Sequence, residues 1–212
     1  MIEIRNLKFG YKDKNILNGI SFSIKKGDTL SILGANGSGK STLLRIMLGF
    51  LKFEGTVNIC GKSVRNYEKK ELARLIAYVP QTHAPSYEYS VFDIVLMGAL
   101  CRTSLFSNFS LADKKLAEYA LERMGILELK PTTGLDFGNQ IKLLEMIKTL
   151  KDEGYTFVQT THYPRHAKFV SNLVLFLKDG KILDFGKCDE LINPSNIDKI
   201  YGIDYQKYED KL

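Results

Sequence analysis

Apolar and polar residues alternate along the first 30 positions in the manner of antiparallel strands. A period of two places successive side chains on opposite faces of a sheet, and turn-forming residues at 12–15 and 25–28 separate the alternating stretches. The pattern therefore predicts an antiparallel β layer at the start of the chain. Its apolar members are Ile2, Ile4, Leu7, Phe9, Ile20, Phe22 and Ile24.

The pattern changes at residue 30, where the mostly apolar run 30–33 predicts a buried strand. Residues 34–39 contain three glycines and predict a loop, and helical spacing begins at Ser41 with Leu44 and Met47 on one side. Strand, loop and helix therefore follow one another without a gap.

This loop fits the pattern Gly-x-x-x-x-Gly-Lys-Ser in the context that the pattern requires. Glycines allow backbone N–H groups to approach an anion, and the start of a helix attracts negative charge to the same point. Lysine adds a full positive charge, and a serine hydroxyl is an oxygen ligand suited to Mg²⁺. The alternative is an ordinary glycine-rich turn. The candidate nucleotide-binding residues are Gly34, Ala35, Asn36, Gly37, Ser38, Gly39, Lys40, Ser41 and Thr42.

Further along the chain, the pattern predicts both helices and strands. Ser90 and Ser110 are each followed three residues later by an aspartate, which is typical of a capped helix start. The expected elements are a strand at 55–61, a helix at 68–75, a buried strand at 76–81, helices between 90 and 123, a helix at 139–150, a strand at 155–162, a hairpin at 173–185 and short helices at 189–201.

Three side chains outside the loop are candidates for the same site. Tyr11 ends a predicted strand and could stack on a base, although such a tyrosine more often packs or lies on the surface. Gln81 ends another strand and could ligate Mg²⁺ or orient a water molecule, with a surface glutamine as the alternative. His162 ends a strand at the edge where open α/β sheets bind ligands, and the alternative is a structural histidine.

Composition and charge argue against several classes of protein, among them nucleic-acid-binding and membrane-spanning proteins. The chain has 212 residues, 44% hydrophobic, which suits a single domain over 1–212 with a helical subregion at about 86–130. The 30 Lys and Arg residues are spread along the chain with 24 Asp and Glu residues between them, so we expect a solvated surface and no nucleic-acid partner. The three cysteines lack metal-ligand spacing and are expected to be free thiols. Neither a leader pattern nor an apolar run of membrane-spanning length is found, which favours the cytoplasm.

The order of these pieces resembles the ATP-binding subunits of ABC transporters. The matching positions are Tyr11 for the adenine-stacking aromatic, 34–42 for the Walker A loop, Gln81 for the Q-loop, 131–136 with Asp136 for the D-loop segment, and His162 for the switch histidine. Residues 90–98 resemble importers of the iron-siderophore, haem, cobalamin and molybdate class.

The resemblance implies an α/β fold of the P-loop NTPase type, with an N-terminal antiparallel β layer and a helical insert. It also implies ATP and Mg²⁺ as cofactors, with Ser41 and Gln81 as metal ligands and with His162 and Gln81 at the reacting end of the nucleotide. The implied partners are integral membrane permease subunits and a second copy of the chain. The implied location is peripheral, on the cytoplasmic face of the membrane.

The sequence also departs from the family pattern. Family members carry a Leu-Ser-Gly-Gly signature loop, a helix and a Walker B strand ending in Asp-Glu before the D-loop proline. Here 127–130 runs directly into Pro131, Leu129 and Lys130 stand where Asp-Glu is expected, and no Gly-Gly pair occurs in the chain. The strand pattern shows the same gap, because only helices and loops are predicted between the strand at 76–81 and the strand at 155–162. A missing loop, helix and strand would amount to roughly 30 residues. We therefore expect the fold to lack one core strand and hydrolysis to be impaired.

Three functions compete on this basis. The first is the energy-coupling subunit of a metal-chelate or oxyanion importer. The second is a non-hydrolysing nucleotide-binding regulatory subunit, or a truncated inactive product. The third, a soluble ABC-type protein acting on DNA or the ribosome, is disfavoured because such proteins usually carry two cassettes or long coiled insertions.

Overall fold

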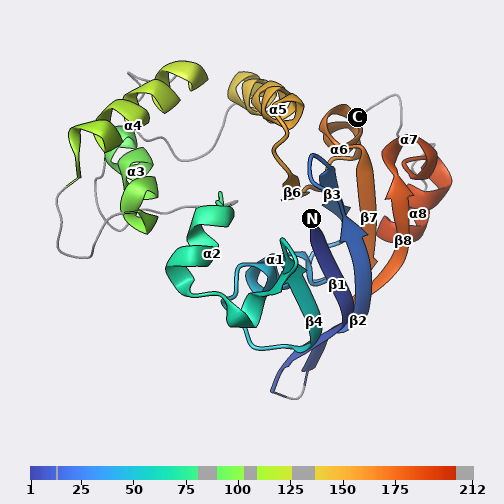
Figure 1. Ribbon diagram of the computed structural model, residues 1–212. Coiled ribbons are helices and arrows are strands. Elements are labelled where there is room, and N and C mark those ends of the chain that lie inside the picture. The colour runs from blue at the N-terminus through green and yellow to red at the C-terminus, as the bar shows by residue number, and fades with distance from the viewer. Residues whose placement is uncertain (13, 81–89, 103–108, 126–136, 204–212) are drawn as a thin grey trace. The chain divides into compact units, whose positions relative to one another are not determined.

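The computed structural model describes residues 1–12, 14–80, 90–102, 109–125 and 137–203 (Figure 1). The chain divides into two compact units, one formed by Met1–Tyr67 with Leu143–Leu212 and the other by Glu68–Lys142. The first unit contains both sheets, and the second is helical. Neither unit has, in its described part, a helix long and apolar enough to cross a membrane.

The predicted N-terminal β layer is confirmed. Strands β1 (Ile2–Tyr11), β2 (Lys14–Ile24), β4 (Glu54–Ile59) and β5 (Lys62–Ser63) form an antiparallel sheet in the order β2-β1-β4-β5. The alternation of the sequence becomes an alternation of burial from Ile20 to Ile24, because successive side chains point to opposite faces. Ile4 and Leu7, and likewise Leu17 and Ile20, are three residues apart, where the pairing of β1 with β2 shifts register. The buried members include Ile4, Leu7, Leu17, Ile20, Phe22, Ile24, Val57 and Ile59.

A second sheet carries the loop of interest. It has the order β6-β3-β7-β8, with β3 at Thr29–Leu33, β6 at Phe157–Thr160, β7 at Leu173–Lys178 and β8 at Lys181–Lys187. Strand β3 pairs in parallel with β6 on one side and β7 on the other, so the carboxyl ends of all three lie at one edge. The predicted hairpin at 173–185 is confirmed, and β6 is shorter than the predicted 155–162.

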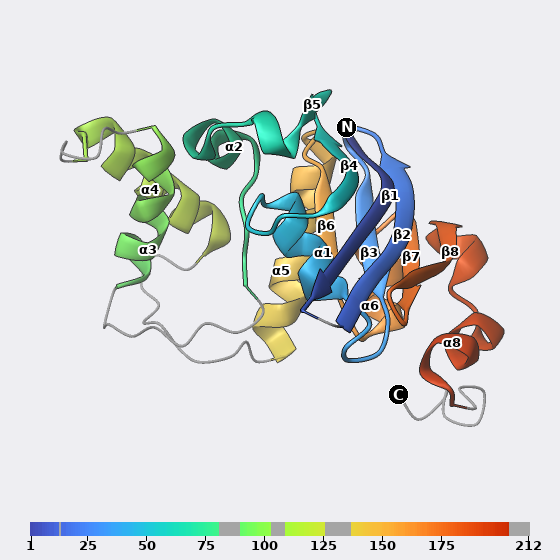
Figure 2. The ribbon, with the colours of Figure 1, turned by 90° about the horizontal axis from the view of Figure 1, so that it is seen from below.

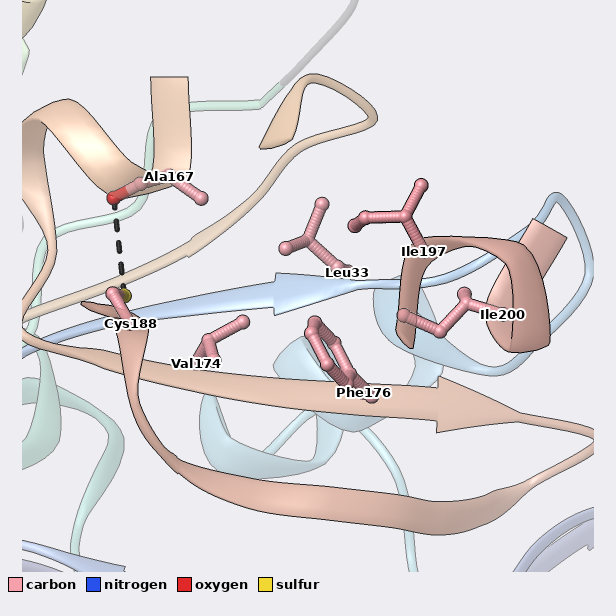
Figure 3. Close-up of a cluster of buried hydrophobic side chains, with 7 residues drawn as sticks. All are labelled: Leu33, Ala167, Val174, Phe176, Cys188, Ile197 and Ile200. Carbon is pink, nitrogen blue, oxygen red and sulfur yellow. Dashed lines mark hydrogen bonds between the residues drawn. The ribbon is translucent and has the colours of Figure 1, made fainter. Parts of the chain in front are cut away.

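Helices complete the first unit. Helix α1 (Lys40–Met47) follows the loop, α6 (Pro164–Val170) follows β6, and the short α7 (Cys188–Leu191) and α8 (Pro194–Tyr201) end the described chain. Figures 1 and 2 show α8 on the side of the second sheet where β7 and β8 lie, and α8 contacts β7. Side chains from these helices and from β3 and β7 form a buried cluster (Figure 3): Leu33, Ala167, Val174, Phe176, Cys188, Ile197 and Ile200.

The helical unit contains α2 (Lys69–Leu75), α3 (Val91–Met97), the 3₁₀ turn η2 (Gly98–Cys101) and α4 (Leu111–Met124). The helix α5 (Phe137–Asp152) begins in this unit and ends in the first, and the 3₁₀ turn η1 (Val64–Asn66) precedes α2.

Both predicted helix starts are capped as expected. The Ser90 hydroxyl accepts a bond from the Asp93 N–H at 3.0 Å, and the Asp93 carboxylate accepts one from the Ser90 N–H at 3.2 Å. Ser110 and Asp113 repeat this arrangement at the start of α4. Each box satisfies backbone N–H groups that a helix start would leave without partners. These two boundaries are therefore fixed by local residues alone.

The prediction of a buried strand at 76–81 is wrong for 76–80, the part that the structure describes. These residues follow α2 as irregular chain, and the Tyr78 and Val79 side chains are 47% and 84% exposed. A strand needs a neighbour for its backbone hydrogen bonds, and residues 76–80 are not part of either described sheet. The apolar pattern is present, but no strand of the described residues pairs with it.

Candidate functional site

The loop at 34–39 joins β3 to α1, as predicted. Every residue of β3 is buried, and this buries the start of the loop as well. Gly37 and Gly39 have φ angles of 79° and 107°, and Gly39 is the residue that precedes the first turn of α1. Only glycine adopts such angles without strain. The loop therefore turns directly into the first turn of α1, whose unpaired N–H groups attract an anion.

Close packing holds this loop from two sides. A Cβ atom on Gly34 would lie 2.2 Å from the Leu177 carbonyl oxygen on β7, and one on Gly39 would lie 2.7 Å from Leu17 Cδ2 on β2. Neither position has space for a side chain. The two glycines are therefore required by their neighbours, in addition to any role toward a ligand.

The turn between β7 and β8 supports the loop through the backbone. The Gly180 N–H donates to the Ser38 carbonyl at 3.2 Å, and the Gly180 carbonyl accepts from the Asn18 N–H at 2.8 Å. A Cβ on Gly180 would lie 2.2 Å from the Ile16 carbonyl oxygen. The sequence does not predict this support, because nothing local to Gly180 indicates a contact with residues 140 positions or more away.

Lys40 is folded back over the loop. Its ammonium donates to the carbonyl oxygens of Gly34 at 2.7 Å and Ala35 at 2.9 Å, and the residue is only 8% exposed. Burial lowers the pKa of this lysine. Among the described residues no carboxylate pairs with it. The loop thus holds a largely buried positive charge whose partners are neutral.

The remaining loop residues divide by exposure. Ala35, Asn36, Gly37 and Ser41 are exposed, and Thr42 is half-buried. The Ser38 hydroxyl is buried and has no hydrogen-bond partner among the described atoms. Buried polar atoms without a partner are rare in native structures and call for a specific explanation. The outer rim of the loop is therefore open, while an unpaired hydroxyl and a buried ammonium lie beneath it.

His162 meets the loop because β6 is parallel to β3. The strands pair from Thr29 with Phe157 to Ile32 with Thr160, so their carboxyl ends are adjacent. Burial lowers the pKa of His162, the charge of Lys40 lowers it further, and a contact with the Gly34 backbone acts in the opposite direction. Burial and the charge of Lys40 therefore both favour the neutral form of the His162 ring.

Tyr11 lies at the end of β1 and is 45% exposed. Its ring packs edge-on against Phe9, with 4.7 Å between the ring centroids and 88° between the planes. It belongs to the β1–β2 hairpin, whose Leu17 contacts Gly39. An exposed aromatic face is therefore carried by the hairpin that packs on the loop.

Two predicted site residues, Gln81 and Asp136, lie outside the described residues, as do Leu129, Lys130 and Pro131. Within the described part of the chain no cluster of three or more His, Cys, Asp or Glu side chains could hold a metal ion. Among the described residues of the loop, the exposed Ser41 hydroxyl is the candidate ligand for a cation.

Comparison with known proteins identifies relatives along most of the chain. The ABC transporter family profile matches residues 17–142. A Haemophilus influenzae protein, an uncharacterized ABC transporter ATP-binding protein, is 32% identical, with 95% of this chain and 89% of that protein covered. A Helicobacter pylori protein named "probable iron chelatin transport ATP-binding protein" is 30% identical, with 100% and 98% covered.

That second alignment extends over 249 positions although this chain has 212 residues, so some residues of the relative have no counterpart here. Among solved structures, an ABC transporter assigned to the metal-chelate type, in an inward-facing conformation, superposes with a TM-score of 0.80 at 26% identity. It covers 95% of this chain, and 89% of its own length is matched. With the loop, its lysine and the parallel strands around it, the chain belongs to the ABC transporter family of ATP-binding proteins.

Proposed function

We propose that this chain is the ATP-binding subunit of an importer for an iron chelate or a related metal chelate. Two observations on relatives support the substrate class: the Helicobacter pylori relative is named for iron chelatin transport, and the superposed transporter is of the metal-chelate type. The segment 90–98 carries the resemblance to the same class of importers.

The observation that carries the nucleotide-binding part of this proposal is the state of Lys40. A buried ammonium with only carbonyl partners is costly unless an anion completes its surroundings. Gly34 and Ala35 supply the two carbonyl partners, and the first turn of α1 adds its partial positive charge at the same point. The phosphates of a nucleotide match this arrangement in charge and size.

The surrounding residues suit the rest of the nucleotide. Ser41 offers an exposed hydroxyl in the first turn of α1, which would supply one oxygen ligand to a Mg²⁺ ion bound with the nucleotide. Bound Mg²⁺ neutralises phosphate charge and orients the terminal group. The Ser38 hydroxyl lacks a partner, and the exposed ring of Tyr11 is available for stacking on the adenine. Gln81 is proposed as a second metal ligand.

We also propose that hydrolysis is impaired. The family uses a Walker B aspartate and the following glutamate to hold Mg²⁺ and to polarise water, and 127–130 of this chain supplies neither. Asp136, the D-loop candidate, and His162 do not replace them in the family pattern. The excess length of the relative's alignment supports a missing segment. A regulatory subunit that binds nucleotide without turnover is therefore the second candidate function.

The proposed partners are integral membrane permease subunits, together with a second copy of the chain in the family's nucleotide-bound dimer. This would place the chain on the cytoplasmic face of the membrane. Helix α3 and the turn η2 expose Ile94, Met97 and Leu100, which gives the helical unit an apolar surface suited to a protein partner. Nucleic acid is not among the proposed partners.

The first prediction concerns Lys40. Substitution Lys40→Ala should weaken MgATP and ADP binding by about 10- to 100-fold, because charged hydrogen bonds to the phosphates are lost. Titration with a fluorescent nucleotide measures this. Lys26→Ala is the matched control, since Lys26 is exposed and precedes β3 at the end opposite the loop. Equal affinities of the two variants would remove Lys40 from the site.

The second prediction concerns the lowered pKa of His162. As pH falls below the pKa of an ordinary histidine, His162 is protonated in the unfolded chain more readily than in the folded chain. The free energy of unfolding should therefore fall as pH drops from about 7.5 to about 5. Urea denaturation of the unmodified chain and of His162→Asn compares the two. The variant should lose less stability over this range, and identical pH dependence would contradict the assignment.

The third prediction concerns the apolar surface of α3. A cysteine introduced at Ile94, in a chain with Cys60 and Cys101 replaced, should crosslink to an integral membrane protein in membranes from the source organism. A cysteine at Leu183 on β8 serves as the control, because it is equally accessible on the other unit. Crosslinks from Ile94 to soluble proteins alone would favour the regulatory function.

The fourth prediction concerns turnover. Phosphate release should lie close to background, because a positioned base contributes about 10² to 10⁴ in rate and charge stabilisation a similar factor. A version with a family-typical segment inserted before Pro131 should gain activity. Steady release by the chain without the insert, abolished by Lys40→Ala, would show that other residues perform the chemistry.

A further inference from the structure

Strand β6 (Phe157–Thr160) is an edge of its sheet with half of its backbone groups unpaired among the described residues. The N–H groups of Phe157 and Thr161 donate to the carbonyls of Asp28 and Ile32, at 3.0 and 3.3 Å, on the β3 side. Because successive residues of a strand point their N–H and C=O groups to opposite sides, those of Val158 and Thr160 point away from β3. No described residue bonds to them.

Natural proteins protect such edges with charges, prolines, bulges or covering elements. The stretch 155–161 around β6 contains no charged residue and no proline, and it is rich in β-branched and aromatic residues. The opposite edge differs: β8 carries Lys181, Asp184 and Lys187, its pairing with β7 contains a register shift, and strand β2 packs on it. Among the described residues of the first unit, β6 is therefore the edge of this sheet that lacks such protection.

We propose that β6 is the site at which two copies of this chain associate, edge to edge, into one continuous sheet. A two-fold axis at Gln159 would place Val158 opposite Thr160 of the second copy. Each such facing pair in an antiparallel ladder exchanges two N–H···O=C bonds. The outward groups of Val158 and Thr160 are then all satisfied, and the surface is its own complement, as a two-fold interface requires.

Charge and rigidity favour a second copy over another partner. Self-pairing places identical residues close together, and a strand without charges does so without like-charge repulsion. Gln159 donates from Nε2 to the Ser31 hydroxyl at 2.9 Å, which anchors the strand to β3 before any association. This association differs from the nucleotide-bound dimer proposed above, since it uses the sheet edge and needs no ATP.

The test is the oligomeric state of the full chain without nucleotide, by sedimentation velocity between about 1 and about 100 µM, the affinity range expected of a short interface. The unmodified chain should shift from monomer to dimer over this range. Val158→Lys should remain monomeric, because it would place two ammonium groups on one face of the ladder, diagonal to each other across the axis and each opposite Thr160 of the other copy. Leu183→Lys, which adds the same charge to the exposed side of β8, should dimerise normally.

Amide hydrogen exchange on the unmodified chain provides a second measurement that does not depend on a variant folding. Exchange at Val158 and Thr160 should slow as concentration rises, while Phe157 and Thr161, already bonded to β3, should change little. A chain that stays monomeric would overturn the proposal. So would a dimer that Val158→Lys leaves intact, or protection of Val158 and Thr160 that does not depend on concentration.

Discussion

The close approach of Gly34 to the backbone of β7 is the constraint on which the candidate site depends. The Leu177 carbonyl oxygen lies where a side chain on Gly34 would begin. The carbonyl of the same glycine accepts the Lys40 ammonium, and its backbone is also in contact with His162. One peptide therefore fixes the end of β3, the position of the buried charge and the distance of the histidine. Any change that moves β7 also moves all three.

Local chemistry explains most of what the sequence predicted correctly. The loop motif specifies its own strand and helix, because glycine adopts the φ angles of 79° and 107° at Gly37 and Gly39 without strain. The serine and aspartate of each capping box lie three residues apart and need no distant partner. The N-terminal strands are likewise predictable, because apolar and polar residues alternate within each strand. These features could be read from the chain because the interactions that create them lie within a few residues.

Features that depend on distant partners could not be read in this way. The apolar run at 76–80 has the pattern of a strand, yet an isolated pattern does not supply a neighbour to pair with. The support of the loop by Gly180 joins segments that are far apart in sequence, and no signal at either end predicts it. The position of Gln81 and Asp136 relative to the loop is of the same kind. For such residues, a motif predicts identity but not placement.

The buried thiol of Cys188 has a consequence for the motion of the unit that carries the loop. Its Sγ lies 4.0 Å from the Ala167 carbonyl within the cluster under β7, and burial raises its pKa to about 12 (Figure 3). Because the thiolate is the reactive form, this thiol is about a thousandfold less ionised than an ordinary one at neutral pH. It reacts only when the packing of α6, α7 and β7 opens. The rate at which a thiol reagent modifies Cys188 therefore measures how often this core opens, and no amino-acid substitution is needed for the measurement.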